Sequence, residues 1–241
     1  MTAPHREKRD TTMPRLALDQ GLKELHADVL TLGSMVEKSI QRSVEALRTR
    51  DASVARRVIE DDASVNGLRF QIEDHALLLI ATQQPLVHDL RTIAAVLNII
   101  TDLERMGDHA EGTATISLMI GDEPLLKPLL DIPRMAETVT DMLRRALLAF
   151  TDHDVVSARR VAAEDDAVDA LYNQVYRELL TFMIGDPRTI HQATLLLWAA
   201  HNLERIGDRV TNICERVLFT ETGRMQEIRP SGARKMQEEL R

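Results

Sequence analysis

The feature of the sequence that most constrains the fold is an internal repeat. The stretch LERMGDHAEGTA occupies residues 103–114, and LERIGDRVTNIC occupies residues 203–214. The similarity extends upstream, because EDDASVNGL at 60–68 corresponds to EDDAVDAL at 164–171. Each of these acidic segments is followed by an apolar stretch, a proline and a further apolar stretch that carries the repeated hexapeptide. The chain is therefore an internal duplication, and its two halves are expected to share one fold.

The residues around the repeats favour helix throughout. Only 3% of the residues are aromatic, and the chain has 10 glycines and 8 prolines in 241 residues. The first long segment has one apolar stripe at three- and four-residue steps, typical of an amphipathic helix. We expect no strands. Glycine, proline and capping residues divide the chain into six predicted helices, at about 16–48, 51–84, 85–119, 134–150, 154–183 and 187–219.

One strong interruption separates the two halves. The segment GDEPLLKPLLDIP, residues 121–133, carries three prolines and a glycine. Short connections between consecutive helices make neighbouring helices antiparallel. We therefore predict an all-α fold of two tandem three-helix up-and-down bundles. The predicted division is a flexible N-terminus at 1–14, a first bundle at 15–121, a linker at 122–133, a second bundle at 134–221 and a tail at 222–241.

Charge and cysteine content narrow the class of protein. The formal net charge of -8 argues against a partner made of nucleic acid, since proteins that bind phosphate backbones usually carry a basic excess. The single cysteine, Cys214, leaves no internal disulfide and favours a reducing compartment. No stretch has the length and apolarity of a signal peptide core or a membrane span. We expect a cytoplasmic protein that meets a membrane only through partners.

Acidic side chains recur at helical spacing in both halves. Residues four apart lie on one face of a helix, so each repeated hexapeptide supplies a row of oxygen donors, and the preceding helix supplies a second row. The carboxylates of such rows repel one another unless a bound cation neutralises them. A set of oxygen ligands suits magnesium, manganese, calcium or iron, and zinc is a further candidate. The candidate metal ligands are Asp62, Asn66, Glu104, Asp108, Asp165, Asp169, Glu204, Asp208 and Asn212.

A glycine precedes the last acid of each hexapeptide. A glycine inside a helix costs about 1 kcal/mol relative to alanine, so Gly107 and Gly207 indicate that another group must approach the backbone closely, either a ligand or a neighbouring helix. The alternative interpretation of the acidic rows is a solvated helix face, because exposed carboxylates are common. The duplication of both rows favours cation binding over that alternative.

These residues also carry a resemblance to a known family. QPLVHDLRTIAAVLNIITDLERMGDHA at 84–110 and LLLWAAHNLERIGDRVTNI at 195–213 resemble the two repeats of the PhoU family of phosphate-signalling regulators. The resemblance covers residues 16 to 220 and implies two three-helix bundles, metal clusters on the ExxxD faces and a homodimer. It also implies a cytoplasmic negative regulator that contacts the phosphate sensor histidine kinase and the ATP-binding subunit of the phosphate ABC transporter.

The two halves differ in their match to the family pattern. The third-helix motif of the family corresponds to Glu104 and Asp108 in the first half and to Glu204, Asp208 and Asn212 in the second. The second-helix row corresponds to Asp62 in the first half and to Asp165 and Asp169 in the second. Gly112 stands where the second half has Asn212, and Asn66 stands opposite Asp169. The first site therefore has fewer charged ligands by this count, and we expect the second site to bind metal more tightly.

The sequence offers little support for catalysis. A di-iron oxidase in a helical bundle would carry two Glu-x-x-His pairs, and neither half has one. No nucleophile and base pattern or phosphate-binding glycine loop is present, so we predict no enzymatic activity. His201, three residues before Glu204, is a further possible ligand, and Cys214 is expected to be a buried apolar residue. A metal-free helical adaptor with another partner remains the alternative function.

Overall fold

The computed structural model describes residues 12–228, with side chains from Arg15 onward. Most of the predicted N-terminus at 1–14 and of the predicted tail at 222–241 lies outside this range. The helices are α1 (Thr12–Thr49), α2 (Ala52–Gln83), α3 (Val87–Ile120), α4 (Asp131–Thr151), α5 (Val155–Ala163), α6 (Asp165–Gly185) and α7 (Ile190–Thr222), with a short 3-10 turn, η1 (Pro187–Thr189), before α7.

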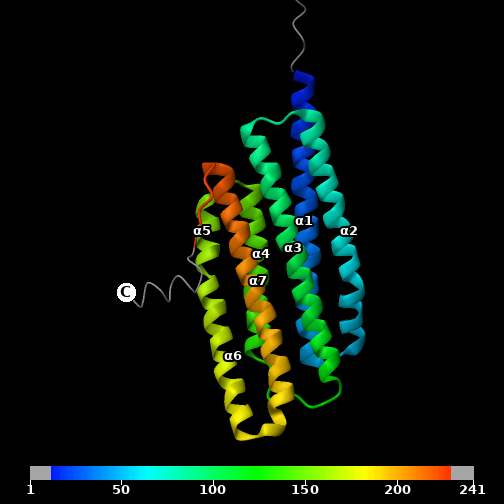
Figure 1. The fold of residues 1–241 in the computed structure, drawn as a ribbon, viewed down its shortest axis with the longest axis vertical. Helices are drawn as coiled ribbons and strands as arrows, with labels where there is room; N and C mark the ends of the chain where they lie inside the picture. Colours follow the sequence, from blue (N-terminus) through cyan, green and yellow to red (C-terminus); the bar gives the residue numbers. More distant parts are fainter. Residues whose placement is uncertain (1–11, 229–241) are drawn as a thin grey trace, which may run out of the picture.

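The arrangement of these helices confirms the predicted fold class. Helices α1, α2 and α3 run up and down as one bundle, and α4, the α5–α6 pair and α7 repeat the same course (Figure 1). No strand occurs between residues 12 and 228. The two bundles lie side by side, with α3 packed against α7 and α1 packed against α4. The third helix of each repeat therefore lies at the centre of the molecule.

The two repeats share one hydrophobic core. Buried side chains of both repeats belong to a single cluster, among them Leu32 of α1, Ile99 of α3, Met142 of α4 and Ile206 of α7. Burial of apolar surface is the main favourable term in folding, so the repeats stabilise each other across this shared core.

The proline-rich connection between the repeats is held against α7. The buried side chain of Gln192 accepts a hydrogen bond from the backbone N–H of Leu126 at 2.7 Å and donates one to the carbonyl oxygen of Pro124 at 3.0 Å. Leu129 of the same connection is buried. The segment predicted as a linker therefore packs on the second repeat instead of spanning open solvent.

Capping aspartates set the starts of the equivalent helices in both halves. The Asp51 carboxylate accepts from the backbone N–H groups of Ser53 and Val54 at the start of α2. Asp154 does the same for Val156 and Ser157 at the start of α5. Side chains of this kind satisfy N–H groups that the first helical turn leaves without partners.

The helix predicted over 154–183 is wrong in one respect, because the structure divides it at Glu164. The Glu164 N–H donates to the Val161 carbonyl at 3.0 Å, and its own carbonyl accepts from Ala167 at 2.9 Å. Both bonds span three residues instead of four, which tightens the chain locally. The carboxylate of Glu164 is held by the guanidinium of Arg145 on α4, with one contact at 2.8 Å. This tertiary contact accompanies the break and leaves Asp165 at the first position of α6.

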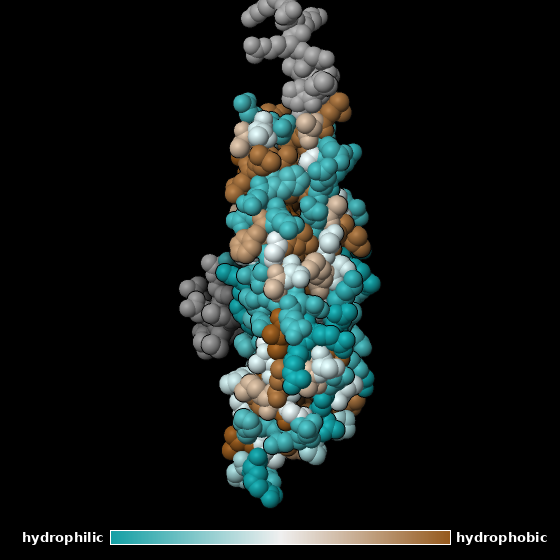
Figure 2. All heavy atoms as spheres, turned by 90° about the vertical axis from the view of Figure 1, so that its right-hand side faces the viewer, coloured by the Kyte–Doolittle hydropathy of each residue, from teal (hydrophilic) through white to brown (hydrophobic). Residues whose placement is uncertain are grey.

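The outer face of the first repeat is mainly hydrophilic, but hydrophobic side chains gather at one end of it (Figure 2). Exposed large apolar residues are concentrated where α2 passes into α3, namely Leu77, Leu78, Leu86, Val87 and Leu90.

In the described part of the chain, no helix has an apolar stretch that is long enough to cross a bilayer.

Candidate metal centres

The glycine of each repeated hexapeptide makes room for an aspartate of the preceding helix. A β-carbon at Gly107 would lie 3.1 Å from Oδ1 of Asp62, and one at Gly207 would lie 2.6 Å from Oδ1 of Asp165. The close approach predicted from these glycines is thus made by a carboxylate on a neighbouring helix. Each glycine therefore lies directly beneath an acidic cluster, which is formed between the second and third helical elements of its repeat.

The first acidic cluster joins α2 to α3. Ligand oxygens of Asp62, Asp108 and Glu111 all lie within 4.8 Å of one another. Asn66 donates a hydrogen bond from Nδ2 to Oδ2 of Asp62 at 2.7 Å, which orients that carboxylate. Glu104 lies one turn before Asp108 on α3 and is half-buried. The structure therefore brings together the four predicted residues of the first half, and it adds Glu111.

Burial and the crowding of carboxylates in this cluster raise the pKa of several of them. Burial and the negative charge of Asp108 raise the pKa of Asp62 and of Glu104. Burial, with the charges of Asp62 and Asp108, also raises the pKa of Glu111. A raised carboxyl pKa means that the charged form is disfavoured, and a bound cation would remove that penalty.

Glu111 is the ligand candidate that the sequence prediction missed. It lies three residues after Asp108, and residues three apart share a helix face as residues four apart do. The prediction considered only residues four apart, and the residue four after Asp108 is Gly112. The equivalent position of the second repeat holds Thr211, so the duplication gave no signal for Glu111.

The second acidic cluster joins α6 to α7. Burial, together with the negative charges of Asp208, Asp169 and Asp165, raises the pKa of Glu204 to about 7. Asp165 is itself buried at the start of α6. The four predicted carboxylates of the second half therefore lie close enough to affect one another electrostatically.

Basic side chains border the second cluster. Nη1 of Arg205 lies 2.7 Å from Oδ2 of Asp208. Nδ1 of His201 lies 3.3 Å from Oε2 of Glu204, but within residues 12–228 that buried oxygen accepts no hydrogen bond of good geometry. A buried carboxylate oxygen without a hydrogen-bond donor is costly, and coordination to a cation would satisfy it.

Asn212 lies apart from the acidic rows. Its Nδ2 donates to Oδ1 of Asp102 on α3 at 3.3 Å, and Arg209 contacts the same oxygen at 3.3 Å. Asn202, also on α7, makes a second contact with α3, with Nδ2 3.3 Å from Oγ1 of Thr113. The structure thus places Asn212 in the contact between the two repeats, while the other eight predicted residues lie at the two clusters.

The donors at both clusters fit a hard cation. All are carboxylate or amide oxygens, apart from the nearby His201 imidazole, and such sets suit magnesium, manganese or ferric iron. Cys214 offers no thiolate, since it is buried on α7 and burial raises its pKa to about 12. Its predicted character as a small buried residue is confirmed.

Comparison with known proteins gives the family. The PhoU domain matches residues 29–116 and 132–217, which covers both repeats. The chain belongs to the PhoU family. A relative from Clostridium acetobutylicum, named phosphate-specific transport system accessory protein PhoU homolog, is 37% identical over 217 residues, covering 90% of this chain and 99% of that protein. A homolog of the same name from Caulobacter vibrioides is 40% identical over 203 residues, covering 84% of this chain and 88% of its own length.

Solved structures of the PhoU family have the same fold. The crystal structure of PhoU from Pseudomonas aeruginosa matches with a TM-score of 0.81 at 33% identity, covering 86% of this chain and 99% of that chain. The phosphate transport system regulatory protein PhoU from Streptococcus pneumoniae matches with a TM-score of 0.81 at 31% identity, covering 87% and 99% of the two chains. The resemblance predicted from the doubled hexapeptide is therefore confirmed.

Proposed function

We propose that this chain is a metal-binding negative regulator of phosphate uptake and of the phosphate-starvation response. Membership of the PhoU family supports a role in the regulation of phosphate transport, because its relatives are named as accessory or regulatory proteins of the phosphate transport system. The metal ions of the proposal are divalent or trivalent cations bound at the two acidic clusters, with iron, zinc, magnesium and manganese as candidates.

The observation that carries the metal-binding part is the repeated acidic cluster built around a glycine. In each half, an aspartate of the preceding helical element occupies the space above Gly107 or Gly207. In each half, burial and then repulsion by neighbouring carboxylates raise the pKa of a glutamate on the third helix. A purely solvated acidic face needs neither the glycine nor the burial, whereas a cation site uses both.

The partners of the proposal are the phosphate sensor histidine kinase and the ATP-binding subunit of the phosphate ABC transporter, both contacted by a homodimer at the cytoplasmic side of the membrane. The exposed hydrophobic residues where α2 passes into α3 support a protein contact, since such patches mark interaction surfaces. Co-purification from detergent extracts at low and high salt tests these contacts, and the acidic chain should bind less at high salt.

Expression of phosphate-starvation genes tests the proposal directly. Deletion of the gene should derepress these genes in high phosphate, and the wild-type protein should restore repression. The Asp108→Ala/Asp208→Ala variant should fail to restore it, while Asp74→Ala should succeed, because Asp74 is an exposed acid of α2 outside both clusters. Unchanged repression after deletion would contradict the regulatory role.

The alternative function is a metal-free helical adaptor, because helical bundles present long faces to partners whether or not ions bind. The same experiment separates the two functions. An adaptor whose acidic clusters are only solvated faces would repress equally well with both aspartates replaced by alanine. Comparable cellular levels of the three variants, measured by immunoblot, are the necessary control.

A further inference from the structure

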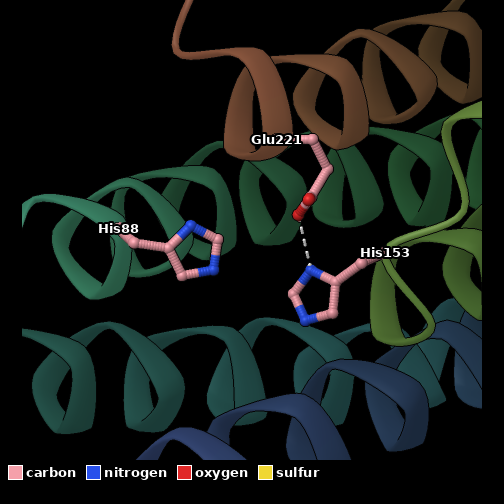
Figure 3. Close-up of side chains that lie close together, drawn as sticks. All are labelled: His88, His153 and Glu221. Atoms are coloured by element: carbon pink, nitrogen blue, oxygen red, sulfur yellow. Dashed lines mark hydrogen bonds and ion pairs between the residues drawn. The ribbon is translucent and has the colours of Figure 1, made fainter.

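A second type of side-chain cluster lies at one end of the molecule, away from the acidic clusters. Ligand atoms of His88, His153 and Glu221 all lie within 4.8 Å of one another. Nδ1 of His153 is 2.8 Å from Oε1 of Glu221, and the ring centroids of the two histidines are 5.9 Å apart. Figure 3 shows the three side chains pointing into one space between the helices.

The three residues come from elements that are distant in sequence. His88 belongs to the first turn of α3, and Glu221 belongs to the last turn of α7. His153 lies in the turn between α4 and α5 and has a φ of 56°, a left-handed conformation that is uncommon for a residue other than glycine. The cluster therefore joins the first repeat to two elements of the second.

A close backbone contact fixes the end of α7 next to α3. The guanidinium of Arg91, one turn after His88, packs on Gly223, where a β-carbon would lie 2.5 Å from it. Gly223 has a φ of 70° and ends α7. This contact holds the last turn of α7, with Glu221, against the start of α3.

The donor set differs in kind from the acidic clusters. Two imidazoles and one carboxylate are ligands that suit zinc and related transition metals, whereas magnesium prefers oxygen alone. Zinc with three such ligands binds each at about 2.0–2.2 Å and keeps a fourth position for water. All three side chains are exposed, so small rotations can bring their donor atoms to that spacing.

We propose that His88, His153 and Glu221 form a transition-metal site, with zinc as the best-suited ion, which ties the two repeats together. The bound ion takes the place of the hydrogen bond between His153 and Glu221 and adds His88 as a third ligand. One metal ion then links α3 to the α4–α5 turn and to α7.

His26 of α1 forms the inner wall of this site. Its ring lies 6.2 Å from that of His153 and packs edge-on against Phe150 at 5.1 Å. Its Nε2 is buried and has no hydrogen-bond partner among the described residues. Burial and the nearby His153 lower the pKa of His26.

Cobalt spectroscopy tests the site apart from the acidic clusters. Co²⁺ replaces zinc in nitrogen and oxygen sites and gives visible absorption there. In the full-length Asp108→Ala/Asp208→Ala protein with excess Mg²⁺, titration should give one Co²⁺ per chain with these bands. Adding His88→Ala or His153→Ala should weaken binding by more than about 100-fold, because loss of even an outer-shell partner costs 10–100-fold. The control His191→Ala changes an exposed histidine of α7 and should leave binding unchanged.

Thermal unfolding supplies a second measurement that does not depend on the spectrum. In the Asp108→Ala/Asp208→Ala protein with excess Mg²⁺, where the acidic clusters are disabled, Zn²⁺ should raise the Tm, because an ion that binds only the folded state stabilises it. The rise should disappear in His153→Ala and persist in His191→Ala. The proposal is overturned if the cobalt bands survive in both His88→Ala and His153→Ala, or if Zn²⁺ shifts the Tm of the His153→Ala variant as much as that of its parent.

Discussion

Glycine stands at positions 107 and 207 because an aspartate of the neighbouring helix occupies the space that a side chain would need. The two positions differ in how tightly they are filled. A β-carbon at Gly207 would lie 2.6 Å from Asp165, whereas the distance from Gly107 to Asp62 is 3.1 Å. Asp165 is also the more buried of the two aspartates, so it has less freedom to move away.

This difference predicts unequal effects of alanine. Gly207→Ala should destabilise the protein by about 1–3 kcal/mol, the usual cost of overpacking. Gly107→Ala should be close to neutral, since a smaller clash is offset by a gain of about 1 kcal/mol in helix propensity. Urea unfolding of the metal-free variants measures both values. A larger loss at Gly107 than at Gly207 would contradict the packing account.

Glu204 predicts a pH dependence of stability. Its pKa is about 7 in the folded chain against an ordinary value of 4.5. Between these values the folded state binds more protons than the unfolded state, so this residue's contribution to stability is fully present below about pH 4.5 and is lost as the pH rises to about 7. The charged form at pH 8 therefore opposes folding when no metal is bound.

Glu204→Gln should consequently stabilise the metal-free protein at pH 8. The expected rise in Tm is a few degrees, because about 1 kcal/mol corresponds to about 2–4 °C at this chain length. At pH 4.5 the gain should shrink strongly, since the wild-type carboxyl is then largely protonated in the folded state. Scans in chelator at both pH values provide the test, and equal gains at both would contradict the assigned charge repulsion.

At the level of helices, periodicity and capping predicted most of the fold. The apolar stripes, the aspartate caps and the prolines located six helical segments close to their observed bounds. The break at Glu164 could not be predicted, because it is tied to the ion pair with Arg145 on another helix. The site of His88, His153 and Glu221 was missed for the same reason, since only the packing of α3 against α7 and the α4–α5 turn brings these residues together.

Glu111 of α3 also changes the expected order of metal affinity of the two clusters. The prediction of a weaker first site counted Asp62, Glu104 and Asp108 as its only carboxylates, but Glu111 adds a fourth. The second cluster also has four carboxylates, so charge count no longer separates the two sites. The expectation that the second site fills first remains a prediction without that support.

Glu111→Thr would remove this added carboxylate by introducing the residue found at the equivalent position, 211. Binding at the first cluster should weaken, since ligand charge is a main determinant of affinity for hard cations. Binding at the second cluster should stay the same. Calorimetric titration with Mn²⁺ resolves the two classes of sites, and an unchanged first class would remove Glu111 from the ligand set.

For the whole molecule, the shared hydrophobic core predicts cooperative unfolding. Two bundles with separate cores could melt separately, but buried residues of both repeats form one cluster here. Ile206→Ala, in the core of α7, should lower the stability by about 2–5 kcal/mol. The variant should still unfold in a single transition at a lower temperature. Amide hydrogen exchange should show α2 and α6 losing protection together as the temperature rises. Separate melting of the two repeats would contradict the shared core.

The metal content of protein purified without chelator or metal affinity columns shows whether the two acidic clusters bind metal ions. Elemental analysis and calorimetry should find bound cations in the wild-type protein and in the control Asp74→Ala. Asp108→Ala and Asp208→Ala should each lose one of the two acidic classes of sites, and the double variant should lose both of these. Equal metal binding by the wild-type protein and the double variant would contradict the claim.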